Sequence, residues 1–160
     1  MHKMSGCWRG CGWREVITVL MGAPGAGKST WAKANMNGTE HIYTTEMVRK
    51  DREIDVDAYM HSQRTAAVRA VKAGKWLIAD GTHTIALHRS LWLALAKNCG
   101  MDCRIICFDT PLPILLAVQK AREFPAPYKV VIDHHQRFQI ARHMVKREGW
   151  GSVEMIRRTL

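Results

Sequence analysis

The stretch from Val16 to Thr30, VITVLMGAPGAGKST, constrains the fold of this chain more than any other segment. Its first six residues are mostly apolar and partly β-branched, which is typical of a strand buried in a parallel sheet. The glycine-rich turn that follows fits the pattern G-x-x-x-x-G-K-[ST], and Ser29 begins a predicted helix. A strand, a glycine-rich turn and a helix in this order predict a loop that binds phosphate groups.

The chemistry of a polyphosphate assigns roles within this loop. Glycines let backbone N–H groups curl round an anion, and the helix N-terminus adds a favourable dipole. Lys28 is expected to reach the β- and γ-phosphates of a nucleoside triphosphate, and the Ser29 hydroxyl is expected to bind Mg²⁺. The residues predicted to hold the nucleotide are Gly22, Ala23, Pro24, Gly25, Ala26, Gly27, Lys28, Ser29 and Thr30.

Length and charge narrow the class of protein. A chain of 160 residues is expected to form one domain, here residues 15–160, after an irregular extension over residues 1–14. Lysines and arginines number 24 against 14 acidic residues, which gives a formal charge of +10. A domain this basic attracts polyanions, and nucleic acid is the commonest of them. The alternative is that the charge serves only solubility or the nucleotide itself.

The cysteines give no disulfide framework, because they are five in number and irregularly spaced. Cys7 and Cys11, with His2 nearby, lack the spacing and the fourth ligand of a metal site, so free thiols are expected. No signal peptide is apparent, and no apolar stretch is as long as a membrane span. We therefore expect a cytoplasmic protein that does not contact membranes.

An acidic residue and an arginine follow the second predicted strand, which covers residues 41–44. With Thr45 as helix cap, Glu46 and Arg49 share one face of the next helix. Ligands of open α/β sheets collect at the carboxyl ends of the strands. Glu46 is therefore a candidate base for an acceptor hydroxyl, and Arg49 is a candidate ligand of the acceptor's phosphate. The alternative is an ordinary exposed ion pair.

Asp80 ends the third predicted strand, residues 76–79, and precedes a helix predicted over residues 85–98. At the same edge of the sheet, its carboxylate could hold Mg²⁺ together with Ser29, or orient the acceptor hydroxyl. The alternative is that Asp80 only caps the helix. On that helix we expect Arg89 to face solvent.

A lid is predicted over residues 117–129, where basic residues and two prolines separate two helices. We expect no packed core in this segment. Arg122 is the candidate cation that stabilises charge on a transferred phosphoryl group, and Lys120 is the next candidate. The alternative is a loop whose basic residues are incidental. Further strands are predicted at residues 104–108 and 152–156, and a long helix at residues 130–147.

The chain resembles the 5′-kinase domain of phage-type polynucleotide kinases and related small, AAA_33-like P-loop nucleic-acid kinases. The similarity rests on the loop from Gly22 with its trailing Ser-Thr-Trp-Ala, on Glu46 with Arg49, and on Asp80, and it covers most of residues 16–160. It implies a three-layer α/β P-loop NTPase with an adenylate-kinase-like parallel sheet of four to five strands and a lid. In that family an aspartate stands where this chain has Glu46 and acts as general base, and the arginine at Arg49 grips the phosphate beside the acceptor.

What the resemblance implies is an enzyme that uses ATP and Mg²⁺ to phosphorylate a hydroxyl of nucleic acid. The first expectation is a polynucleotide 5′-hydroxyl kinase acting on DNA rather than RNA. Because Glu46 is one methylene longer than aspartate and no end-healing phosphatase domain is attached, a kinase of a hydroxymethylated base in phage DNA stays open as an alternative. Two other classes are a nucleoside or small-molecule kinase and an ATP-dependent binding module. The sequence does not indicate an oligomeric state.

Overall fold

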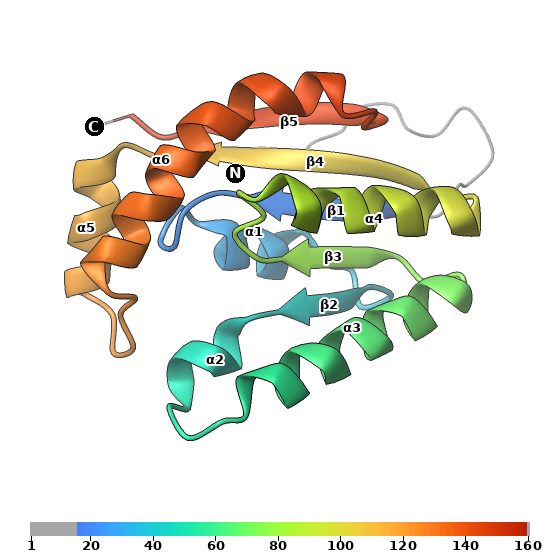
Figure 1. Cartoon of the computed structure of the whole chain (residues 1–160), viewed down its shortest axis with the longest axis horizontal. Coiled ribbons are helices and arrows are strands. Elements are labelled where there is room, and N and C mark those ends of the chain that lie inside the picture. Colours follow the sequence, from blue (N-terminus) through green and yellow to red (C-terminus); the bar gives the residue numbers. More distant parts are fainter. Residues whose placement is uncertain (1–15, 160) are drawn as a thin grey trace.

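Five parallel strands form the sheet at the centre of the computed structural model, which describes residues 16–159 (Figure 1). The strands are β1 (Val16–Met21), β2 (His41–Thr44), β3 (Leu77–Asp80), β4 (Asp102–Asp109) and β5 (Ser152–Arg157), in the order β2-β3-β1-β4-β5. Because every pairing is parallel, the carboxyl ends of the strands share one edge of the sheet. The predicted extension over residues 1–14, with Cys7 and Cys11, lies outside the described residues.

Helices cover both faces of this sheet. They are α1 (Lys28–Asn35), α2 (Glu46–Lys50), α3 (Val56–Lys72), α4 (Ala86–Cys99), α5 (Leu112–Lys120) and α6 (Tyr128–Met144), which continues into the 3-10 turn η1 (Val145–Arg147). Val71, Trp92 and Phe138, from α3, α4 and α6, pack in one buried cluster, whereas Ala32 of α1 and Leu115 of α5 pack in another. The predicted three-layer α/β P-loop fold is therefore confirmed.

Burial along the strands explains why they lie inside. In β1 every residue after Val16 is buried, because helices pack against both faces of the sheet. Ile17 and Val19 belong to the cluster that includes α4, while Leu20 belongs to the cluster that includes α1. This alternation follows from the two-residue period of a strand. The phosphate loop thus starts from a buried strand.

The prediction that Arg89 faces solvent is wrong. Its side chain is only 2% exposed and lies on the same side of α4 as the buried Trp92. The guanidinium forms an ion pair with Glu148 and donates a hydrogen bond to the carbonyl oxygen of His83 (2.9 Å). A buried charge is stable only when it is paired in this way. Sequence periodicity could not identify a partner 59 residues away.

Three further findings concern the described residues. Gln119 and Ala126 are buried, which corrects the expectation that residues 117–129 include no packed core. Cys99, Cys103 and Cys107 are free thiols. Over residues 16–159, the helices are too short or too polar to cross a membrane.

Candidate active site

The phosphate loop turns sharply between β1 and α1. Gly25 and Gly27 have φ angles of +93° and +100°, a region that side chains disfavour. At Gly25 there is also no room, since an added Cβ would lie 2.7 Å from Nε2 of Gln119. The ammonium of Lys28 donates hydrogen bonds to the carbonyl oxygens of Gly22 (2.9 Å) and Ala23 (2.8 Å). The lysine therefore holds the loop in its curled shape.

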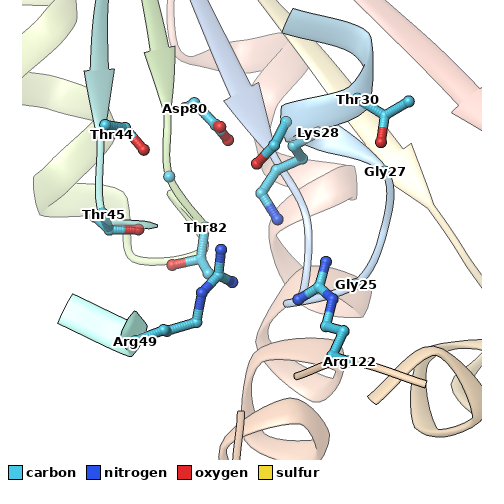
Figure 2. Close-up of a pocket in the computed structure, with 12 residues that line it drawn as sticks. Gly25, Gly27, Lys28, Thr30, Thr44, Thr45, Arg49, Asp80, Thr82 and Arg122 are labelled. Carbon is cyan, nitrogen blue, oxygen red and sulfur yellow. The ribbon is translucent and has the colours of Figure 1, made fainter. Parts of the chain in front are cut away.

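A pocket opens beside this loop at the carboxyl edge of the sheet (Figure 2). Figure 2 shows Arg49 of α2 and Arg122 of the segment after α5 pointing toward each other from opposite sides, with Lys28 between the loop and Asp80. The residues that line the pocket are Gly25, Gly27, Lys28, Ser29, Thr30, Thr44, Thr45, Arg49, Asp80, Gly81, Thr82 and Arg122.

Four of the five predicted catalytic residues, which are distant from one another in the sequence, thus meet in one pocket. They are Lys28, Arg49, Asp80 and Arg122. Both predicted metal ligands, Ser29 and Asp80, line it as well. Of the predicted nucleotide-binding loop, Gly25, Gly27, Lys28, Ser29 and Thr30 line the pocket, whereas Gly22, Ala23, Pro24 and Ala26 belong to the loop without lining it.

Glu46 does not line this pocket. Its carboxylate forms an ion pair with Lys50, one turn further along α2, at 2.8 Å. The hydrogen bond and charge of Lys50 lower the pKa of Glu46. Asp80 is the carboxylate among the residues that line the pocket. To reach an acceptor in the pocket, Glu46 has to leave its partner on the surface of α2.

Sequence reasoning did not place Thr44, Thr45, Gly81 and Thr82 in the site, although each lines the pocket. Thr44 ends β2, and Gly81 follows the last residue of β3. The hydroxyl groups of the threonines and the backbone of Gly81 therefore lie at the edge where ligands of parallel sheets bind. The signal that could have found them is this position directly after a strand, beside residues already chosen for their charge.

Comparison with known proteins assigns the fold to a family. Residues 17–143 match the family model AAA_33, described as an AAA domain. The chain belongs to the AAA_33 family. Its fold is also found in the AvrRxo1-ORF1:-ORF2 crystal structure with ATP (TM-score 0.68, 16% identity, 92% of this chain and 56% of that chain). A second similar structure is the Pnkp1/Rnl/Hen1 RNA repair complex (TM-score 0.67, 16% identity, 87% and 49%).

A third similar structure is Chaetomium thermophilum Kti12 in complex with ADP-AlF3 (TM-score 0.64, 17% identity, 88% of each chain). At these identities the similarity establishes the fold alone. This AAA_33 chain spans about half the length of the first two chains that it matches.

The charges in the pocket of this AAA_33 domain suit a polyphosphate. Among the described residues that line it, Arg49, Arg122 and the protonated form of Lys28 carry positive charge, and Asp80 supplies the carboxylate. Burial lowers the pKa of Lys28 to about 7; Asp80 counteracts this, whereas Arg49 and Arg122 lower it further. An anion that entered between these cations would relieve their mutual repulsion. The loop residues predicted to hold ATP therefore fit its triphosphate.

Mg²⁺ also fits the residues present. Asp80 is 7% exposed, and within residues 16–159 no hydrogen bond engages its carboxylate. The hydroxyl of Ser29 lines the same pocket. No group of three or more His, Cys, Asp or Glu residues that could hold a metal occurs in the part of the chain that the structure describes. Mg²⁺ needs only one or two protein ligands where phosphates and water supply the rest.

The low pKa of Lys28 predicts that ATP binding takes up a proton. At pH 8 and without ATP, Lys28 is mostly the neutral amine, because its pKa is about 7. A triphosphate favours the charged form and raises that pKa. Nearly one proton should bind with ATP at pH 8, and far less at pH 6. Calorimetry in buffers of different ionisation enthalpy measures this uptake.

The control is Lys28→Arg, whose guanidinium stays charged throughout this range and should take up no proton. Equal binding enthalpies in the two buffers at pH 8 for the unmodified protein would contradict the expected uptake.

A buried histidine fixes the segment after Asp80. His83 has a φ angle of +45° and is 5% exposed. Trp92 donates from Nε1 to Nε2 of His83 (2.9 Å), so the ring proton lies on Nδ1, which donates to the carbonyl oxygen of Leu20 (2.8 Å). Burial lowers the pKa of His83 to about 4. The neutral ring thereby joins the Asp80 segment to the end of β1, where the phosphate loop starts.

This histidine predicts a loss of stability in acid. Between pH 6.5 and about pH 4 the unfolded chain binds a proton at His83 that the folded chain does not, so the free energy of unfolding falls with pH. A His83→Asn variant lacks this titration. The difference in free energy of unfolding between the unmodified protein and this variant, measured in urea, should therefore shrink by about 2–3 kcal/mol between pH 7 and pH 4.5. A difference in free energy of unfolding that stays constant over this range would contradict the lowered pKa of His83.

Proposed function

We propose that this AAA_33 domain is an ATP-dependent phosphotransferase that moves the γ-phosphate to a hydroxyl of nucleic acid, and first of all to a 5′-hydroxyl end. The observation that carries the proposal is the pocket, where Lys28, Arg49 and Arg122 from three segments surround Asp80, whose carboxylate forms no hydrogen bond with the described residues. Phosphoryl transfer depends mainly on positioning and on stabilising charge, which such a set of side chains supplies.

Each side chain has a proposed role in that reaction. Lys28 binds the β- and γ-phosphates, and Arg122 stabilises charge on the phosphoryl group as it moves. Arg49, on the opposite wall, binds a phosphate of the acceptor strand. Ser29 and Asp80 would hold Mg²⁺, which neutralises phosphate charge when bound. Asp80 also lies where it can orient the acceptor hydroxyl.

A polyanionic acceptor is favoured by the net charge of +10, which exceeds what binding one nucleotide requires. The fold is shared with a chain of an RNA repair complex, which is compatible with a nucleic-acid substrate. DNA rather than RNA is our first expectation. A 5′-hydroxyl end is the simplest acceptor, because it reaches a pocket without leaving a base stack.

The second candidate is a kinase of a hydroxymethylated base, such as 5-hydroxymethyluracil, in phage DNA. The observation that favours it is Glu46, which is longer than aspartate and is paired with Lys50 outside the pocket lining. With Glu46 in this place, the acceptor hydroxyl would lie in a different position, as the hydroxymethyl group of a nucleobase does. An ATP-dependent binding module is expected if Glu46 and Arg122 are remote from the phosphate loop; Glu46 does not line the pocket, whereas Arg122 lines it with that loop.

Transfer of label from [γ-³²P]ATP tests the function and distinguishes the candidates. The acceptors are 5′-hydroxyl DNA, 5′-hydroxyl RNA, a hydroxymethylated duplex and a panel of nucleosides. Label on 5′-hydroxyl DNA is the expected result. Label on the hydroxymethylated duplex alone would establish the second candidate, and label on nucleosides alone would exclude a nucleic-acid kinase. ATP binding without transfer to any acceptor would indicate a binding module.

Glu46→Gln tests the proposed general base. We expect turnover to fall on the order of tenfold, a modest effect because phosphoryl transfer needs little proton removal before the transition state. ATP binding should survive, since Glu46 does not line the pocket. Lys50→Gln is the matched control, because it frees Glu46 from its partner and keeps the carboxylate. Unchanged turnover in Glu46→Gln would assign the base to another group, with Asp80 as the next candidate.

A further inference from the structure

A buried glutamine connects the phosphate loop with the segment that carries Arg122. Gln119 lies in the last turn of α5 and is 1% exposed. Its carboxamide Nε2 donates to the carbonyl oxygen of Pro24 in the phosphate loop (3.0 Å). Its Oε1 accepts from the backbone N–H of Ala126 (2.9 Å). One side chain thus bonds to two segments that are about a hundred residues apart in the chain.

The same residue also holds the start of that segment. The backbone carbonyl of Gln119 accepts a hydrogen bond from the N–H of Arg122 (3.2 Å). Residues 122–126 therefore form a short loop whose two ends are both bonded to Gln119, once through its backbone and once through its side chain. Arg122 lines the active-site pocket, while Ala126 is buried in the core with Leu115.

The phosphate-loop side of this connection is equally tight. Gly25 follows Pro24, and an added Cβ at Gly25 would lie 2.7 Å from Nε2 of Gln119, so the amide packs directly beneath the loop. The neighbouring carbonyl of Ala23 accepts from Lys28. The consecutive carbonyls of Ala23 and Pro24 thus accept hydrogen bonds from Lys28, the proposed phosphate ligand, and from Gln119.

We propose that Gln119 is a positioning residue, whose carboxamide ties residues 122–126 to the phosphate loop and so sets where Arg122 stands over the pocket. The proposal rests on the phosphotransferase function proposed above. A carboxamide suits the task because it both donates and accepts, whereas a buried hydrocarbon would leave the Pro24 carbonyl and the Ala126 N–H without partners. An arginine held in advance loses less conformational freedom when the phosphoryl group moves.

The test is a double-mutant cycle between Gln119→Met and Arg122→Ala, with affinity for ADP plus aluminium fluoride as the readout. Methionine keeps the size and burial of the side chain but removes both hydrogen bonds. If Gln119 acts through Arg122, each single variant should weaken binding about tenfold, and the double variant should be no weaker than Arg122→Ala within about twofold. Additive losses would show a merely structural role and overturn the proposal.

Hydrogen exchange gives a second readout on the same variants. The amide of Ala126 should lose protection in Gln119→Met and keep it in Gln136→Met, the same substitution at an exposed position of α6. Retained protection would overturn the proposal. If Gln119→Met fails to fold, Gln119→Asn replaces it in both measurements. Asparagine keeps the carboxamide, but its side chain is one methylene too short to bond to both partners. Neither measurement needs an acceptor, so absence of phosphoryl transfer would remove the proposed function and leave this test intact.

Discussion

Replacing Lys28 by alanine is expected to lower phosphoryl transfer by about 10³-fold or more, which corresponds to about 4 kcal/mol of lost transition-state stabilisation. The substitution removes one of three cations in the pocket and the two hydrogen bonds that hold the carbonyls of Gly22 and Ala23. The loss should not come from unfolding. Burial already lowers the pKa of Lys28 to about 7, so the folded protein gains little from its charge. Label transfer and thermal unfolding, measured together, separate the two causes.

Lys33→Ala is the matched control for this prediction. Lys33 lies on the same helix, α1, but is exposed and does not line the pocket. It should keep its activity, whereas more than about a tenth of normal transfer in Lys28→Ala would show that another group binds the γ-phosphate.

The layout of the fold could be predicted from local signals. The buried run before the phosphate loop and the lysine and serine after it predict β1 and α1, and they leave few other arrangements. The long helix predicted at residues 130–147 is also found, as α6 with its continuation η1. These signals depend on residues close together in the chain, where a spacing of three or four has a direct structural meaning.

Arg89 shows where such signals fail. A helical pattern treats arginine as a surface residue, but its partner, Glu148, is supplied by a segment that follows another helix. The roles of His83 and Gln119 were missed for the same reason. The side chain of His83 bonds to the carbonyl of Leu20 in the first strand, and that of Gln119 bonds to the carbonyl of Pro24 in the phosphate loop. Polar residues that bridge distant segments are visible only when the fold brings their partners together.

The candidate site was predicted in part, through the rule that parallel strands present their carboxyl ends at one edge. That rule brought Arg49 and Asp80 to the phosphate loop, and both line the pocket. The rule could not predict which of two neighbouring residues on one short helix lines the pocket. Glu46 and Arg49 are three residues apart on α2, yet of the two only the arginine lines the pocket, while the glutamate forms an ion pair with Lys50.

Asp80→Asn is expected to lower phosphoryl transfer on the order of 10²–10³-fold, as loss of a carboxylate that binds Mg²⁺ or the acceptor hydroxyl would. Asparagine keeps the size of the side chain and removes its charge. ATP without Mg²⁺ should bind as well as before or more tightly, because the change removes the negative charge from a pocket with three cations. A loss of turnover with preserved nucleotide binding therefore places the defect in the chemical step.

A titration of activity with Mg²⁺ separates the two roles of this carboxylate. If Asp80 binds the metal, as we propose, the variant should need a severalfold higher Mg²⁺ concentration for half-maximal activity. An unchanged Mg²⁺ requirement would leave orientation of the hydroxyl as its role, and the pH dependence of the remaining activity would then report the loss of that contact. Asp57→Asn, at an exposed position in the first turn of α3, is the matched control and should change neither quantity. Full activity of Asp80→Asn would remove both roles, because the described residues that line the pocket include no second carboxylate that could replace it.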